Sequence, residues 1–248
     1  MLYSVLLVGQ SNMAGRGILS QVEPVYNFHI KVLKNGLWRT MFQPIHWDTS
    51  TAGVCLAESF ALEFLKDHPE DSIGLIPAAD GGTCLDQWMP GEPLFESAVF
   101  QAKQAMRSSQ LVGILWHQGE SDCGKELYPL YEEKCTYILT SLRQALGVDV
   151  PVILGGLGDF LADCTLDEQL KNYPHVNKAL QAMAAKLPGF GFASAEGLGA
   201  NPDNLHFHAA ALREFGLRYY EAYKQQQVTF RQAAGEEKNI ERSFIETL

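Results

Sequence analysis

The chain has 248 residues, 46% of them hydrophobic and 19% charged, which is the balance of a globular protein with a substantial core. Its 29 Asp and Glu against 19 Lys and Arg give a formal net charge of -10. This charge, with no basic patch, disfavours nucleic acids and anionic membranes as partners, because both are bound through clustered Lys and Arg.

The cysteines and the first residues indicate where the chain is found. The five cysteines are odd in number and form no CxxC pair, as expected in a reducing compartment rather than in a disulfide framework. The opening MLYSVLLVG has no basic segment or small-residue cleavage site of a signal peptide, and its apolar run is too short to span a bilayer. We therefore expect a cytoplasmic location and no membrane contact.

Apolar runs alternate with amphipathic segments along the chain. The runs predict five strands, and apolar side chains at helical spacing predict five helices between and after them. The expected strands are Tyr3–Val8, Ser72–Ala78, Val112–His117, Val150–Leu157 and Gly189–Ser194; the expected helices are Cys55–Leu65, Leu94–Arg107, Leu127–Leu146, Val176–Leu187 and Ala209–Tyr223.

This alternation predicts an α/β fold in which a five-stranded parallel sheet is covered by helices on both faces, a three-layer α/β/α sandwich. We expect a single domain over residues 1–227, because no linker or repeat interrupts it, and a polar C-terminal tail over residues 228–248. The region Gly17–Val54 has irregular patterning and carries Pro24, Asn35-Gly36 and Pro44. It is interpreted as a long excursion beside the functional site.

Small, polar and titratable residues follow every expected strand. In open parallel sheets ligands bind beyond the carboxyl ends of the strands, so these residues are expected to converge. The segments are Gly9 to Met13, Asp80 to Thr83, Trp116 to Asp122, Gly155 to Asp159 and Asn201 to His206.

Ser11 and the Asp203-x-x-His206 pair predict nucleophilic catalysis. A serine hydroxyl needs an imidazole to accept its proton and an acid to orient that imidazole. Alone, Ser11 would be read as a helix cap or turn residue. His208 is the local rival of His206, but it lies at the start of the last expected helix.

Four further residues are candidates for binding negative charge or orienting the base. The backbone N–H of Gly81 or Gly82 and the side-chain amide of Gln118 are possible donors to an oxyanion. Glu120, two residues after Gln118, either orients His206 or holds its loop. A metal site is disfavoured, because the only candidate set, Asp203 with His206 and His208, lacks the spacing of a recognised motif.

The segments GQSNMAGRG, DGGT, WHQGESD and DNLHF, in this order, resemble the SGNH-hydrolase superfamily. Within it they resemble the branch of sialate O-acetylesterases and acetylxylan esterases, carbohydrate esterase family 6. The resemblance runs from Gly9 to Phe207. It implies a flavodoxin-like fold and deacetylation of a sugar without a metal or other cofactor.

The resemblance also implies residue roles. Ser11 is the expected nucleophile, His206 the base and Asp203 its orienting acid, with Glu120 as a competitor for that last role. The oxyanion donors are the N–H groups of Ser11 and Gly81, with Gly82 as the alternative, and Gln118, which stands where many members have Asn. The candidate substrate contacts are Asn12, Arg16, Asp80, Trp88 and Trp116; Asp80 departs from the apolar residue common before Gly-Gly-Thr.

The expected partner is a small or oligosaccharide acetyl ester, and the oligomeric state is open. Two alternatives remain for the function: a general short-chain esterase or thioesterase of the same fold, and a carbohydrate-binding protein without turnover. An FMN-binding flavodoxin-like protein is disfavoured, because the first loop lacks a Ser/Thr-rich phosphate cradle.

Overall fold

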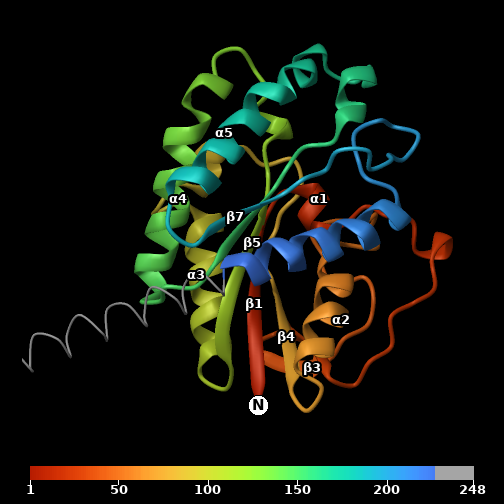
Figure 1. The fold of residues 1–248 in the computed structure, drawn as a ribbon, viewed down its shortest axis with the longest axis vertical. Coiled ribbons are helices and arrows are strands. Elements are labelled where there is room, and N and C mark those ends of the chain that lie inside the picture. The colour runs from red at the N-terminus through yellow and green to blue at the C-terminus, as the bar shows by residue number, and fades with distance from the viewer. Residues whose placement is uncertain (227–248) are drawn as a thin grey trace, which may run out of the picture.

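A computed structural model describes residues 1–226, which contain one seven-stranded sheet in the order β3-β2-β4-β1-β5-β6-β7 (Figure 1). All neighbouring pairs are parallel except β2 and β3. The strands are β1 (Leu2–Gly9), β2 (Ile30–Lys34), β3 (Leu37–Thr40), β4 (Ser72–Pro77), β5 (Gln110–His117), β6 (Val152–Gly155) and β7 (Phe190–Ala193).

The central strand β1 shows why the molecule has three layers. Its side chains alternate between two hydrophobic cores: Val5 and Leu7 belong to one core, and Leu6 and Val8 belong to the other. Because successive side chains of a strand point to opposite faces, a strand that is apolar at every position must be covered on both sides.

Helices form both covers (Figure 1). Helix α2 (Ala57–Asp67) and the helix over residues 209–226 pack on the face that holds Val5. Helices α3 (Pro93–Met106), α4 (Tyr131–Leu146) and α5 (Tyr173–Lys186) cover the opposite face. The predicted three-layer α/β/α arrangement and all five predicted helices are thus confirmed, with boundaries moved by a few residues.

Short helices occupy many of the connections. They are α1 (Ser11–Ala14) and the 3-10 turns η1 (Leu19–Gln21), η2 (Leu85–Trp88), η3 (Glu120–Asp122), η4 (Tyr128–Leu130), η5 (Asp159–Asp163) and η6 (Glu168–Asn172).

The prediction of five strands, all parallel, is wrong for the described residues. The two additional strands, β2 and β3, lie within the region that was expected to be irregular. Asn35 and Gly36, which were interpreted as part of an irregular loop, have φ of 52° and 73° and form the tight turn of a β-hairpin. The hairpin makes β3 antiparallel and places it at the edge of the sheet.

The expected tail, residues 228–248, lies outside the described residues. Within residues 1–226 no helix combines the length and apolar character needed to cross a membrane.

The sheet brings the functional loops together. Gly9, the last residue of β1, pairs in register with His117, the last residue of β5, and β4 ends beside β1 on the other side. The loops that follow these three strands therefore leave the sheet at the same edge.

Candidate active site

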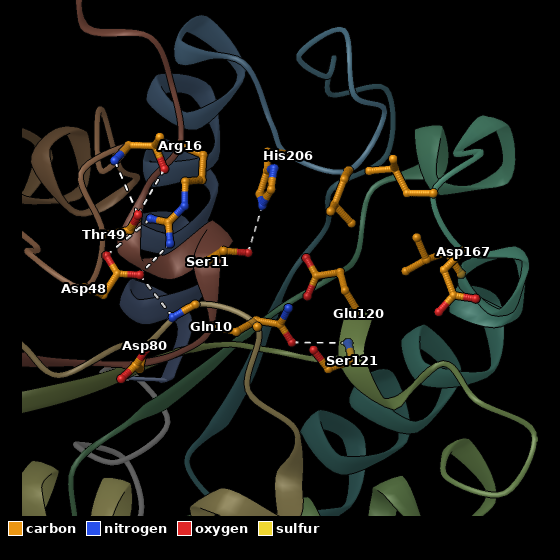
Figure 2. A pocket seen from close by; sticks show the side chains of 16 residues that line it. Gln10, Ser11, Arg16, Asp48, Thr49, Asp80, Glu120, Ser121, Asp167 and His206 are labelled. Carbon is orange, nitrogen blue, oxygen red and sulfur yellow. Dashed lines mark hydrogen bonds and ion pairs between the residues drawn. The ribbon is translucent and has the colours of Figure 1, made fainter.

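A pocket of about 500 Å³ opens at this edge of the sheet (Figure 2). Its walls come from the loops after β1, β4 and β5, from the segment before α2, from the segment between β6 and α5, and from the loop before the last helix. The lining residues are Gln10, Ser11, Arg16, Asp48, Thr49, Thr51, Asp80, Gly81, Gly82, Glu120, Ser121, Leu166, Asp167, Leu170, Leu205 and His206.

Ser11 and His206 meet in this pocket, although 195 residues separate them in the chain. Ser11 is the first residue of α1 and follows β1 after Gln10. The Ser11 Oγ lies 3.0 Å from Nε2 of His206, and Figure 2 shows the two side chains facing each other. This is hydrogen-bond distance for proton transfer between a hydroxyl and an imidazole.

Asp203 completes a chain of hydrogen bonds. Its Oδ2 lies 2.8 Å from Nδ1 of His206, the ring nitrogen opposite Ser11, and its Oδ1 accepts the backbone N–H groups of Leu205 and His206 at 3.0 Å each. Burial acts to raise the pKa of Asp203, but these hydrogen bonds outweigh it and the pKa is lowered. The carboxylate is therefore ionised and oriented toward the imidazole.

Glu120, the competing acid, has different partners. It is buried, and its Oε1 accepts from Asn12 Nδ2 at 2.5 Å and lies 3.4 Å from His117 Nε2. Burial acts to raise the pKa of Glu120, but the bonds from His117 and Asn12 lower it below the ordinary value. The contact with His206 Nδ1 is made by Asp203, so an orienting role for Glu120 is wrong in this geometry, and Glu120 holds loops together instead.

His208, the alternative candidate for the base, contacts the start of the last helix instead of Ser11. Its Nδ1 accepts the backbone N–H of Ala211 at 2.9 Å, in the first turn of the last helix. The imidazole thus satisfies one of the free N–H groups at a helix start.

The expected oxyanion donors differ in whether their N–H groups already donate a hydrogen bond within the protein. The N–H of Gly81 already donates to Asp48 Oδ2 at 3.0 Å. Within residues 1–226 the N–H groups of Ser11 and Gly82 have no hydrogen-bond acceptor, so both remain open to a ligand.

Gln118 is not placed to act as an oxyanion donor. Its side chain is completely buried, and its Nε2 donates to Thr83 O at 3.1 Å and to Asp122 Oδ2 at 2.5 Å. Both amide hydrogens are thus used inside the protein, so the prediction for Gln118 is wrong in this conformation.

The five expected substrate contacts fall into two groups. Arg16 and Asp80 line the pocket. Asn12, Trp88 and Trp116 are each at most 1% exposed, so the prediction that they touch substrate is wrong. The two indoles pack edge-to-face in the core with ring centroids 5.6 Å apart, where their apolar surface contributes to stability.

Several lining residues were missed by the analysis of the sequence. Asp48 pairs with Arg16 at 2.5 Å, and Gln10 Oε1 accepts from the N–H groups of Gly119 and Ser121. Asp48 lies in the region interpreted as an excursion beside the site, which was the only signal for it; no motif or spacing marks it. The described part of the chain contains no group of three or more His, Cys, Asp or Glu that could hold a metal ion.

A serine, a histidine and an aspartate are linked in this order at the carboxyl edge of the sheet, an arrangement in which the imidazole can accept the proton of the serine hydroxyl. Residues 3–225 match the family described as carbohydrate esterase, sialic acid-specific acetylesterase. The chain belongs to this family, and it is a hydrolase that acts on acetyl esters.

Known proteins resemble the chain over most of its length. A protein described as probable carbohydrate esterase At4g34215, from Arabidopsis thaliana, is 28% identical, over 88% of each chain. The solved structure of the Arabidopsis thaliana protein AT4G34215 superposes with a TM-score of 0.79 at 27% identity, covering 90% of this chain and 98% of that one. The structure of NanS has the same fold, with a TM-score of 0.70 at 19% identity over 93% and 98% of the two chains.

Proposed function

We propose that this protein is a serine carbohydrate esterase that removes O-acetyl groups from a sugar through an acetyl-enzyme intermediate. The observation that carries the proposal is the hydrogen-bonded series Ser11, His206 and Asp203 inside an open pocket. The candidate substrates are acetylated xylooligosaccharides and O-acetylated sialic acid.

The distances support a role for each residue. His206 Nε2 accepts the proton of Ser11, and the Oγ attacks the acetyl carbonyl. Asp203 holds the imidazole in the tautomer that has its free nitrogen toward Ser11 and stabilises the imidazolium that forms. His206 then protonates the departing sugar oxygen. In the second half of the reaction His206 takes a proton from water, the water oxygen attacks the acetyl carbonyl, and Ser11 Oγ leaves with the proton from His206 as acetate is released.

The oxyanion of the tetrahedral intermediate is assigned to the N–H groups of Ser11 and Gly82. Both residues line the pocket, and neither N–H group has a hydrogen-bond acceptor within the described chain. Ser11 is also the first residue of α1, where N–H groups lack intrahelical acceptors. Each such donor contributes on the order of 100-fold in rate.

The proposal is tested by acetate release from acetylated xylooligosaccharides and O-acetylated sialic acid. Ser11→Ala is expected to abolish release, whereas Ser97→Ala, on the exposed side of α3, keeps the wild-type rate. Equal inactivity of wild type and Ser11→Ala on a panel of acetyl esters, with binding of the sugars retained, would favour a carbohydrate-binding protein. Faster hydrolysis of 4-nitrophenyl butyrate than of any acetylated sugar would favour a general short-chain esterase.

A further inference from the structure

We propose that the Arg16–Asp48 pair determines which substrates the pocket accepts according to their charge. The pocket selects uncharged acetylated sugars over acetylated sugars that carry a carboxylate. The inference rests on the proposed function and deepens it. It starts from the one residue in the pocket that would attract an anionic sugar.

Arg16 is the only Lys or Arg among the described residues that line the pocket. Its guanidinium is already engaged: Nη2 lies 2.5 Å from Asp48 Oδ2, and Nη1 donates to Gly15 O at 2.9 Å and to Asp48 Oδ1 at 3.4 Å. A guanidinium used in this way has little capacity left to bind a second carboxylate bidentately.

The pair is fixed in place rather than exposed on the surface. The side chains of Arg16 and Asp48 are 10% and 5% exposed, and Asp48 Oδ2 also accepts the N–H of Gly81 at 3.0 Å. A Cβ added at Gly81 would lie 2.5 Å from Arg16 Nη2, so the guanidinium packs directly against this glycine. Displacing Asp48 with a substrate carboxylate would break three contacts and leave a buried charge unpaired.

The remaining charges of the pocket are negative. Asp80, Glu120 and Asp167 line it together with Asp48, as Figure 2 shows. No Lys or Arg within the described chain forms an ion pair with any of these three. Burial, and secondly the Asp48 carboxylate, raise the pKa of Asp80, whereas Arg16 acts in the opposite direction.

A carboxylated sugar therefore enters a site where the one Arg is paired and the exposed carboxylates of Asp80 and Asp167 are not. Like charges about 8 Å apart at a protein surface change binding on the order of tenfold. An uncharged sugar meets no such barrier, and its hydroxyls can donate to the carboxylates of Asp80 and Asp167.

The test uses two substrates that differ by one charge: methyl tri-O-acetyl-glucuronoside as the free acid and as its methyl ester. At low salt, wild-type kcat/KM for acetate release is expected to be on the order of tenfold higher for the methyl ester, and this ratio should shrink toward one at about 0.5 M salt, where the Debye length is only a few ångströms. Equal kcat/KM for the two compounds at low salt would overturn the inference.

The variant Asp48→Asn removes the negative charge beside Arg16. The ratio of kcat/KM for the methyl ester to kcat/KM for the free acid should therefore fall on the order of tenfold, or fall below one. The ratio is the readout because a change at the Gly81 N–H affects both substrates alike. Glu70→Gln removes one exposed carboxylate outside the pocket and should keep the wild-type ratio. An unchanged ratio in Asp48→Asn would overturn the role of the pair, and if this variant does not fold, the salt dependence of the wild type decides.

The two proposals fail in different ways. Acetate release from both sugar esters with equal kcat/KM at low salt would overturn this inference and leave the proposed function intact. Acetate release from 4-nitrophenyl acetate but from neither sugar ester would contradict a carbohydrate esterase and favour a general short-chain esterase. Absence of release from all three compounds would overturn the proposed function and the inference with it.

Discussion

Asn12 Nδ2 donates to Glu120 Oε1 at 2.5 Å, a buried contact between residues 108 positions apart. The same amide accepts the N–H of Phe207 at 3.1 Å through Oδ1 and donates to Leu205 O at 3.2 Å. One side chain thus joins the loops that carry Ser11, Glu120 and His206. The distance between Ser11 and His206 depends on this junction.

Replacing Asn12 with Ala should lower both stability and turnover. The change removes three hydrogen bonds and leaves the buried Glu120 with only the 3.4 Å contact to His117 Nε2, so we expect the free energy of unfolding to fall by about 2–3 kcal/mol. Loss of alignment of His206 should lower kcat more than it raises KM. Urea unfolding and steady-state kinetics measure the two effects.

The matched control for Asn12 is Asn177→Ala. Asn177 also bonds a backbone N–H and a carbonyl, both of Leu157, outside the pocket. It should lose stability without a comparable loss of kcat. Equal losses of kcat in the two variants would show that general destabilisation, not the junction of loops, explains the effect.

Asp203→Asn and Glu120→Gln distinguish the two acids. Asp203→Asn should lower kcat on the order of 10⁴-fold, as expected when the orienting acid of a triad becomes an amide. Less than about 1 kcal/mol of stability should be lost, because the pair with His206 is partly exposed. In Glu120→Gln the amide oxygen can still accept from Asn12, but the bond loses its charge and the NH2 group takes the buried Oε2 position, which has no hydrogen-bond partner, so stability should fall by about 2–3 kcal/mol. A larger loss of kcat in Glu120→Gln, in a variant that remains folded, would contradict this assignment.

The layers of the fold could be predicted because they follow from local patterns. An apolar run such as residues 3–8 needs covers on both faces whatever its neighbours are. The hairpin of β2 and β3 was missed because Asn35-Gly36 marks a turn in either a loop or a hairpin, and the flanking segments are short. The hairpin signal was present in the alternation around this dipeptide.

The site was predictable only where residue types imply a reaction. A serine, a histidine and an aspartate that follow expected strands are together typical of nucleophilic catalysis. Ser11, His206 and Asp203 could therefore be selected as candidate catalytic residues. Asp48, Trp88 and Trp116 could not be placed, because exposure and pairing depend on contacts between distant segments. Gln118 occupies a typical donor position, yet its partners Thr83 and Asp122 direct its amide inward.

Gly216→Ala should destabilise the protein although alanine is normally preferred in a helix. Gly216 lies in the helix over residues 209–226, where an added Cβ would come within 2.1 Å of Ser59 Oγ and 2.2 Å of Leu56 O. The second atom belongs to the backbone of the α2 region and cannot rotate away. We expect a loss of about 1–3 kcal/mol, the range for overpacking.

The effect of Gly216→Ala is measured as the shift in the midpoint of urea unfolding. The control is Ala210→Gly, the opposite change at an exposed position of the same helix. Ala210→Gly should destabilise by about 1 kcal/mol through helix propensity alone. A stabilised Gly216→Ala would mean that the two helices separate at little cost.

His46 should make the stability of the protein depend on pH. Burial lowers the pKa of His46 from 6.5 to about 4. Between these values the unfolded chain binds a proton that the folded chain does not, so stability is lost as pH falls from 6.5 toward 4. The full shift corresponds to about 3 kcal/mol. In His46→Asn this dependence should be absent, and the free energy of unfolding, measured by urea titration at several pH values, should fall less steeply than in the wild type. Parallel curves for the two proteins would show that the imidazole is solvated or protonated in the folded state.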